Sequence, residues 1–505
     1  MNSGLTLLRA PFRDYLLDRL LPVALLIAGI VGTIPVVRSL HVADVNWCYS
    51  YLTRDSYDWI NNGLYWAGAR VAPSFRPPGL PVLIALLWKA GLLSWLPLLN
   101  FSALLATAII LYRLLRRAFP PAVAALASWI FYANDFSQDL AKYVMAEVWA
   151  TFFIVLAALL FLRAANRPRL YTAVGLSLGV GFLVHYVALV AGMGFVLALF
   201  MARRDHLGLT ELWAGAAVSC VLPALWLVAR SSFYRMHPEG PRVVPEALLR
   251  PTFTHVGFFV ITSVALLGLP LLPLYLGGFV SALARLREKG RDYRSTILAL
   301  PIVMGIFFLV IYDWADKRFL FYLFPFLACF LAEGLSRLFA WARASGLRLL
   351  AASAYVSVAL LWNQIHYPTH GIQYVALTPR DFFDAVGRMK GAPVARLHDR
   401  WVSAFADGLF DYRLRPADCR LDGGYTGLLR LRPLLDEMLG RGVAIGLYAP
   451  AGWPADYWSC VNRASNILER PVVRPDLAPC SLAEQEVPGT RTLLSVSPYF
   501  VVCSS

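Results

Sequence analysis

Residues 54–81 read RDSYDWINNGLYWAGARVAPSFRPPGLP, and this stretch lies between two strongly apolar segments. It holds two carboxylates, three arginines, four prolines and four tryptophan or tyrosine rings. Prolines keep a backbone extended, so the stretch can present a carboxylate and a cation on a stiff segment. Its aromatic rings suit the headgroup region of a membrane.

The rest of the chain is strongly apolar. Its 505 residues are 58% hydrophobic and 15% charged, with a mean hydropathy of +0.58, whereas soluble proteins carry about 25% charged residues. Apolar runs of about 20 residues, the length that crosses a bilayer, recur as far as Tyr367. The composition therefore predicts an all-α polytopic membrane protein.

Arginine-rich loops mark the cytoplasmic side of such a protein. With these markers we predict eleven spans, at 20–40, 94–113, 121–136, 143–163, 170–185, 187–202, 210–229, 265–284, 295–312, 319–338 and 347–365. The N-terminus is then inside and the C-terminus outside. No cleavage site followed by soluble sequence comes after the first run, so we expect a retained span there and not a signal peptide.

The apolar stretch Leu80 to Leu93 is too short for a span. We expect it to lie at the outer interface or to re-enter the bilayer. Counting it as a span would reverse the side of the membrane that we assign to every later loop. Arg113, Arg116 and Arg117 would then lie on the outer side.

The formal net charge of +15 would also suit a nucleic-acid-binding protein. The arginines and lysines instead cluster in short loops between the apolar runs, as membrane topology requires. These groups are Arg113, Arg116 and Arg117; Arg163, Arg167 and Arg169; Arg203 and Arg204; Arg285, Arg287, Lys289, Arg291 and Arg294; and Arg337, Arg343 and Arg348. No nucleic-acid partner is expected.

The composition changes after Tyr367. The segment 375–390, VALTPRDFFDAVGRMK, has a Thr-Pro pair that opens a helix. The segment 442–450, GVAIGLYAP, is typical of a buried strand. We therefore predict a transmembrane module at 1–367 and a small extracytoplasmic α/β domain at 368–505.

Seven cysteines are present, without a CxxC pair. Cys220 and Cys329 lie in apolar spans and are expected to be packing residues. Four others fall in the predicted extracytoplasmic domain and could form two disulfides in an oxidising compartment: Cys419, Cys460, Cys480 and Cys503.

The first outer loop, at about 42–93, carries the first candidate residues. Asp55 and Asp58 are three residues apart and would share one face of a helix. Arg76 stands directly before Pro77 and Pro78. The alternative interpretation is a solvated acidic helix cap followed by a kink.

Further polar residues fall on the same side of the membrane. They are Asp135 and Asp139 in the second outer loop, Glu147 at the mouth of a span, the His185–Tyr186 pair between two apolar runs, and Lys317 and Arg318 before a late span. Carboxylates there could act as a general base or hold a divalent metal, for which Asp135 and Asp139 are candidates. Arginine and lysine oppose the topology rule at the outer face, so we expect them to bind a phosphate. Interfacial snorkelling of Glu147 and plain packing of His185 are the alternatives.

Four motifs resemble one family. They are DSYDW, RPPGLP, VMAEVW and KRFLFYLFPFLACFLAEGL, and they cover roughly residues 20–345 in the order and spacing of that family. The chain resembles the GT-C glycosyltransferases, the superfamily of protein O-mannosyltransferases and lipid A aminoarabinose transferases. It is most similar to the bacterial dolichyl-phosphate-mannose-transferase-like branch. Residues 368–505 resemble no family that we can name.

The resemblance implies roles for particular residues. Asp55 matches the catalytic carboxylate, Arg76 the cation that contacts the phosphate, and Lys317 and Arg318 the polar residues near the donor phosphate. The family usually has Glu directly after the catalytic carboxylate, where this chain has Ser56.

Because of that departure, Asp58 or Asp44 could share the role of Asp55. The family often has Arg or Lys followed by Pro where this chain has His185–Tyr186. A role for His185 is therefore the weakest part of the match.

The resemblance implies an inverting glycosyltransferase of the bacterial inner membrane. It would move a sugar from a polyprenyl-phosphate donor to a lipid, glycan or protein acceptor at the periplasmic face. No nucleotide-binding glycine loop is present, which agrees with a lipid donor, and a divalent metal is the one cofactor considered. A lipid transporter or flippase, and a non-catalytic envelope scaffold, are the alternatives.

Overall fold

The computed structural model describes residues 20–39, 59, 62–63, 66–68, 76–92, 95–236, 253, 256–288, 290–312, 317–342 and 345–370, with four short strands between 394 and 502. The chain divides into two units. The first contains Met1–Val42, Pro77–Leu80 and Trp95–Gln373, and the second contains Ala43–Arg76, Pro81–Ser94 and Tyr374–Ser505.

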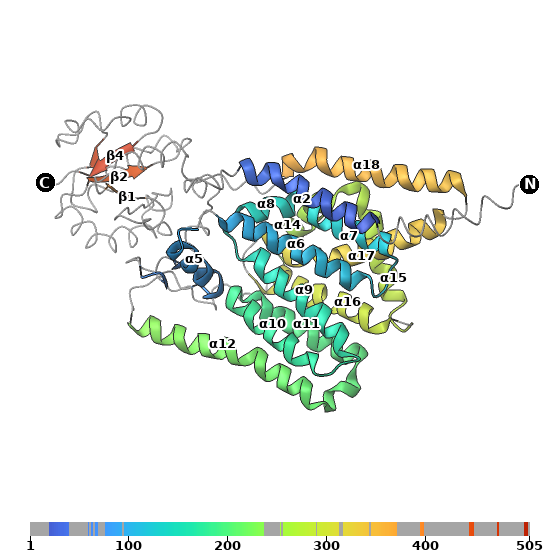
Figure 1. Ribbon diagram of the computed structural model, residues 1–505, viewed down its shortest axis with the longest axis horizontal. Coiled ribbons are helices and arrows are strands. Elements are labelled where there is room, and N and C mark those ends of the chain that lie inside the picture. Colours follow the sequence, from blue (N-terminus) through green and yellow to red (C-terminus); the bar gives the residue numbers. More distant parts are fainter. Residues whose placement is uncertain are drawn as a thin grey trace, which may run out of the picture. The chain divides into compact units, whose positions relative to one another are not determined.

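The first unit is a bundle of helices (Figure 1). They are α2 (Leu21–Ser39), α6 (Leu96–Leu115), α7 (Pro121–Ala133), α8 (Asp135–Lys142), α9 (Glu147–Ala164), α10 (Leu170–Val184), α11 (Val187–Ala202), α12 (Thr210–Met236), α14 (Val256–Leu267), α15 (Leu272–Ala284), α16 (Arg291–Ile306), α17 (Phe324–Ala342) and α18 (Gly346–His370). Short 3₁₀ turns η3 (Arg204–Gly208), η4 (Leu269–Leu271) and η6 (Lys317–Tyr322) and a π-helical turn, η5 (Phe307–Ile311), connect or extend them.

Each of the eleven predicted spans overlaps at least one of these helices, so the all-α fold class of the membrane module is confirmed. Within the described residues, five helices are long and apolar enough to cross a membrane, or six if a bent pair counts as one span. Several other apolar helices are shorter. The number of crossings therefore stays a prediction.

The bundle packs around α9, α10 and α11. Helix α9 contacts α6 and α10, α10 contacts α12, and α11 contacts α16. The long helices α12 and α18 run along its outer edges in Figure 1. Leu225 and Val228 of α12 are exposed. Apolar side chains on an outer edge suit contact with lipid, where helices are held by close packing and not by exclusion from water.

Two boundaries differ from the prediction. The predicted span 143–163 begins only at Glu147, because Tyr143–Ala146 leave the helical conformation between α8 and α9. The predicted span 265–284 is broken, and its two arms, Val256–Leu267 and Leu269–Ala284, are bent by 91°. Gly268 lies at the break with φ 79°, a conformation that glycine adopts readily, and Pro270 follows it.

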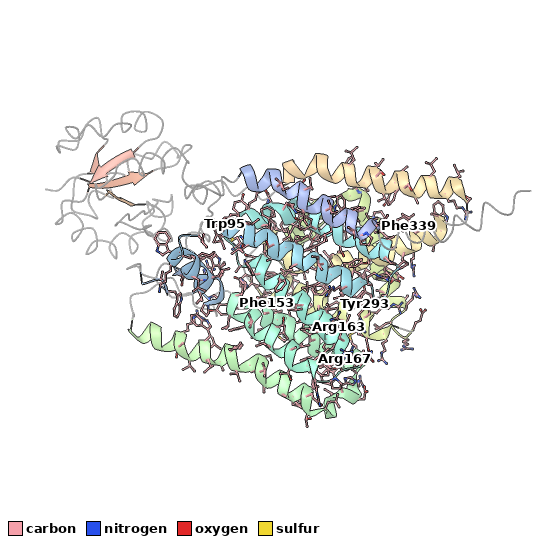
Figure 2. The ribbon with its side chains drawn as sticks, in the orientation of Figure 1. Trp95, Phe153, Arg163, Arg167, Tyr293 and Phe339 are labelled. Carbon is pink, nitrogen blue, oxygen red and sulfur yellow. The ribbon has the colours of Figure 1, made fainter. Side chains whose placement is uncertain are left out.

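The arginine-rich loops gather at one end of the bundle, as predicted. The helices α6, α9 and α11 end there and α10, α12 and α16 begin there. Figure 2 shows Arg163, Arg167 and Tyr293 at this end and Trp95, at the start of α6, at the opposite end. We call these the arginine end and the site end of the bundle.

The four described strands form one mixed sheet of order β1-β2-β4-β3. Strand β1 (Val394–Leu397) pairs parallel with β2 (Ala444–Tyr448), and β4 (Tyr499–Val502) pairs antiparallel with β2 and with β3 (Val472–Val473). The strand predicted in 442–450 is confirmed. The helix predicted from Thr378 and the four cysteines of this region lie outside the described residues.

Helix α5 (Gly79–Lys89) occupies most of the stretch that we excluded as a span. Its 11 residues extend about 16 Å, roughly half the hydrocarbon thickness. It is a helix too short to cross the bilayer, as predicted. Of the two cysteines in the bundle, Cys329 is buried as expected, but Cys220 is exposed on α12, so the expectation that it packs inside is wrong.

Candidate functional site

Glu147 is the first residue of α9 and is only 3% exposed. Helix N-termini stabilise negative charge, because the free backbone N–H groups and the helix dipole both favour it. The non-helical turn at 143–146 sets the point where the helix begins, and so it sets the position of this carboxylate. A carboxylate at this depth is costly unless it is compensated.

Arg318 provides a compensating charge from the turn η6. Its Nε lies 3.4 Å from Glu147 Oε1, and the two side chains are 12% and 4% exposed. The guanidinium also lies 3.6 Å from the sulfur of Met145 and stacks 5.4 Å from the ring centre of Phe319. Two residues that the sequence placed in separate outer loops thus form one buried ion pair.

The same turn reaches His185. The Tyr322 ring, at the end of η6, lies 5.5 Å from the His185 ring. The backbone N–H of Val187 donates to His185 Nδ1 at 3.3 Å. This bond requires an unprotonated Nδ1, so the neutral ring carries its proton on Nε2.

Tyr186 points elsewhere. Its hydroxyl accepts a hydrogen bond from Trp226 Nε1 at 3.3 Å, and the Arg230 guanidinium lies 5.7 Å from its ring centre. The two residues were predicted as one pair, but His185 faces η6 whereas Tyr186 faces α12. The structure therefore brings His185 to the turn that carries Arg318, while the Tyr186 side chain contacts α12.

The RPPGLP motif meets the same end of the bundle through its glycine. A Cβ at Gly79 would lie 2.9 Å from the Leu183 carbonyl oxygen and 2.8 Å from Val184 Cγ2. Only glycine allows this close approach, which seats the Pro-Pro-Gly turn against the end of α10, two residues before His185. This contact gives the motif of the opening stretch a physical reason.

Arg76 belongs to the second unit. Its guanidinium stacks 5.1 Å from the ring centre of the buried Trp59, and its backbone N–H donates to Asn62 Oδ1 at 3.3 Å. Lys317 opens η6 and is half-buried. Asp55 and Asp58 lie outside the described residues, as does Asp44.

Asp135 and Asp139 share the short helix α8. Asp139 pairs with Lys142 at 2.8 Å. Burial raises the pKa of Asp135 above its ordinary value, the neighbouring Asp139 raises it further, and Lys142 partly opposes both. Within the described residues, no group of three or more His, Cys, Asp or Glu side chains could hold a metal ion. A divalent cation at Asp135 and Asp139 stays a prediction, because Mg²⁺ can be held by two carboxylates together with waters and a substrate phosphate.

The raised pKa gives a prediction for pH dependence. The folded protein holds the Asp135 proton more tightly than the unfolded chain does. The stability from Asp135 is therefore complete below its ordinary pKa of 3.8 and is lost as the pH rises through the raised value. We expect Asp135→Asn to stabilise the protein at pH 7 and to have little effect near pH 4 in thermal unfolding. Asp139→Asn, which breaks the Lys142 pair, should not stabilise it at pH 7.

Sequence reasoning missed Asn100, which is 1% exposed in α6. Its amide donates to the Tyr143 carbonyl at 2.9 Å and accepts from Trp149 Nε1 at 2.8 Å. Asn100 thus fixes the turn before Glu147 and the first turn of α9. The signal was an asparagine inside an apolar run, which is costly in a membrane without partners.

We expect Asn100→Ala to lose roughly 1–3 kcal/mol of stability, because it leaves a partly buried indole N–H and a buried carbonyl without this amide. It should also lower turnover by shifting Glu147. Thermal unfolding and a transfer assay measure the two effects. Ser102→Ala is the matched control, since Ser102 is exposed on the same helix and bonds only to Leu98. Equal behaviour of the two variants would contradict a positioning role.

Sequence reasoning also missed Glu333, which is buried in the middle of α17. It accepts from Ser281 Oγ at 2.8 Å and lies 3.2 Å from Arg285. Its partners come from the end of α15 at the arginine end of the bundle. We therefore interpret Glu333 as a structural link between α15 and α17.

We compared the chain with known protein families and solved structures. The family model for dolichyl-phosphate-mannose-protein mannosyltransferase matches residues 76–228. This match includes RPPGLP, Glu147 and His185 but not Asp55, Lys317 or Arg318. No curated protein matches the chain in sequence.

Solved structures match over most of the chain. The oligosaccharyltransferase of Archaeoglobus fulgidus in its apo form is 14% identical, with a TM-score of 0.59 over 90% of this chain and 72% of its own. ArnT from Cupriavidus metallidurans, bound to undecaprenyl phosphate, is 14% identical, with a TM-score of 0.56 over 86% of this chain and 94% of its own. A complex of the archaeal enzyme AglB with an inhibitory peptide and dolichol phosphate gives 14% identity and a TM-score of 0.55, over 89% of this chain and 71% of its own.

The chain therefore has the fold of these solved structures, a helical membrane bundle of the GT-C type that its motifs indicated.

Proposed function

We propose that this protein is a membrane glycosyltransferase that moves a sugar from a polyprenyl-phosphate donor to an acceptor. The observation that carries the proposal is the buried Glu147–Arg318 pair at the site end of a GT-C bundle. A guanidinium held in a water-poor site is well suited to a leaving phosphate. The neighbours support the donor class, since ArnT was solved with undecaprenyl phosphate and AglB with dolichol phosphate.

The proposed reaction is a displacement at the anomeric carbon. Asp55 takes the proton of the acceptor hydroxyl, whose oxygen forms the new bond to the anomeric carbon as the bond to the phosphate oxygen breaks. Arg318, with Lys317 and Arg76, stabilises the departing phosphate, and Glu147 holds the Arg318 guanidinium in place. A single displacement inverts the anomeric configuration. No protein acid is required, because the leaving group is an anionic phosphate.

A lipid transporter is the main rival. Transporters carry paired broken helices and polar groups near the bilayer midplane. One bent pair occurs in the described residues, at Gly268. Glu333, which is buried in the middle of α17, pairs with Arg285 at 3.2 Å. A buried ion pair at the end of a bundle suits surface chemistry on a lipid phosphate better than a transport path.

The direct test is a transfer assay on purified protein with a panel of polyprenyl-phosphate sugars and lipid, glycan and peptide acceptors. We expect one sugar to be transferred with inversion at the anomeric carbon, which NMR of the product detects. An Asp55→Asn protein that folds normally and is inactive would exclude the scaffold alternative. Movement of a labelled lipid across proteoliposomes without any transfer would overturn the proposal in favour of a flippase.

We further propose that the protein lies in a bacterial inner membrane with its site end and C-terminal domain in the periplasm. The arginine end would then face the cytoplasm, as the positive-inside rule favours. A reporter fused after Ser505 should be active only outside the cytoplasm, and one inserted after Arg204 only inside it. A cytoplasmic signal from the Ser505 fusion would contradict this topology.

A further inference from the structure

The arginine end holds a group of cations that the proposed reaction does not use. At its centre Arg203 is 2% exposed and closes α11. Its guanidinium donates to the carbonyls of Phe161 at 2.6 Å and Leu162 at 3.4 Å, and it pairs with Asp292 at 3.1 Å. Arg203 therefore ties the ends of α9 and α11 to the start of α16.

Two further arginines converge on this centre. Arg163 follows Phe161 and Leu162 at the end of α9. Arg117 lies just beyond α6, which packs against α9. The turn after α6 is fixed to the start of α16 by the Phe119 and Tyr293 rings, whose centres are 5.7 Å apart.

The other two arginines act on Arg117. Partial burial lowers the pKa of Arg117, the charges of Arg163 and Arg203 lower it further, and the charge of Asp292 raises it. Asp292 is itself paired with Arg203. Arg285 at the same end differs, because it has both Glu288 and Glu333 as partners.

Membrane topology explains why arginines occur at this end, but it does not explain why three converge. Dispersed arginines satisfy the topology rule equally well. Arg287 of the turn after α15 and Arg337 of α17 are exposed examples. Convergence costs repulsion between like charges, and a bound anion would remove that cost.

We propose that Arg117 and Arg163, backed by the fixed charge of Arg203, bind the phosphate of an anionic phospholipid. Guanidinium groups donate paired hydrogen bonds to phosphate oxygens. Both exposed arginines stand at the ends of apolar helices, which is the depth of lipid headgroups. Arg203 already contacts Asp292 and two carbonyls. It therefore contributes a positive electrostatic potential and does not bind the phosphate directly. The site is independent of glycosyl transfer.

The test is thermal unfolding of the detergent-purified protein during titration with phosphatidylglycerol, with phosphatidylcholine or with inorganic phosphate. We expect selective stabilisation by phosphatidylglycerol. Arg117→Gln/Arg163→Gln should weaken that effect about thirtyfold in lipid concentration, since each cation near an anionic surface contributes about 1 kcal/mol, or fivefold.

Arg287→Gln/Arg337→Gln is the matched control, because it removes two exposed charges at the same end. It should keep the phosphatidylglycerol effect. The proposal would be overturned if both double variants lost the phosphatidylglycerol effect equally. It would also be overturned if phosphatidylglycerol and phosphatidylcholine stabilised the unmodified protein equally. Equal stabilisation by millimolar inorganic phosphate would show a free-anion site and overturn the lipid assignment. Native mass spectrometry of the unmodified and double-variant proteins gives an independent count of retained lipid.

Discussion

Asp55→Asn is expected to lower turnover by about 10²- to 10⁴-fold, the usual contribution of a general base. The amide keeps the shape of the side chain but cannot accept the proton of the acceptor hydroxyl. The cations that contact the donor are unchanged, so donor binding should largely survive. The measurement is turnover and donor affinity on the same purified variant, after its thermal unfolding has been shown to be normal.

Neighbouring variants distinguish the base from its surroundings. Arg76→Ala should weaken donor binding as well as rate, because it removes a proposed phosphate contact. Asp58→Asn should be milder than Asp55→Asn if Asp58 only supports the loop or the acceptor. Near-normal turnover in Asp55→Asn, with loss of activity in Asp44→Asn or Asp58→Asn, would move the catalytic role to another carboxylate.

The helices could be predicted because apolar runs in a membrane protein have few alternatives. A lipid-exposed backbone must satisfy its own hydrogen bonds, so an apolar run of about 20 residues becomes a helix. The late start of α9 could not be found this way. Tyr143–Ala146 read YVMA, and hydropathy does not separate an extended apolar turn from a helical one. The break at Gly268 did leave a signal, since Gly268 and Pro270 stand close together inside the run.

The sequence singled out the candidate residues one by one, but it did not show which of them form pairs. Glu147 and Arg318 each stood out as a charge at the outer mouth of a span. Their contact depends on how η6 packs against α9, and no local pattern reports that packing. His185 and Tyr186 show the opposite case. They were grouped because they are adjacent in sequence, yet the end of α10 turns their side chains toward different neighbours.

The structural roles of Asn100 and Arg203 could not be predicted for a related reason. Asn100 is one polar residue in an apolar run, and Arg203 is one of many arginines at the ends of such runs. Their importance appears only when their hydrogen bonds reach other helices, as those of Asn100 do to Tyr143 and Trp149. Burial, which the sequence does not report, separates both residues from the exposed arginines and serines around them.

Arg318→Leu is expected to destabilise the protein by about 3–5 kcal/mol and to abolish transfer. Removing one partner of a buried ion pair leaves the other charge in a water-poor site without that counter-charge, and such changes are among the most costly single substitutions. Glu147 would then be a deeply buried carboxylate that has lost the guanidinium 3.4 Å away. Thermal unfolding and the transfer assay measure the two losses separately.

The double variant Glu147→Gln/Arg318→Leu separates structure from chemistry. Replacing both charges of a buried pair is often nearly neutral, so this protein should recover most of the stability lost in Arg318→Leu. It should remain inactive, because no guanidinium is left to stabilise the leaving phosphate. Arg318→Lys should fold but turn over slowly, since lysine cannot reproduce the planar, paired contact with phosphate. A stable double variant with normal transfer would show that the ion pair serves the fold alone, and the phosphate would then have to be bound by other cations.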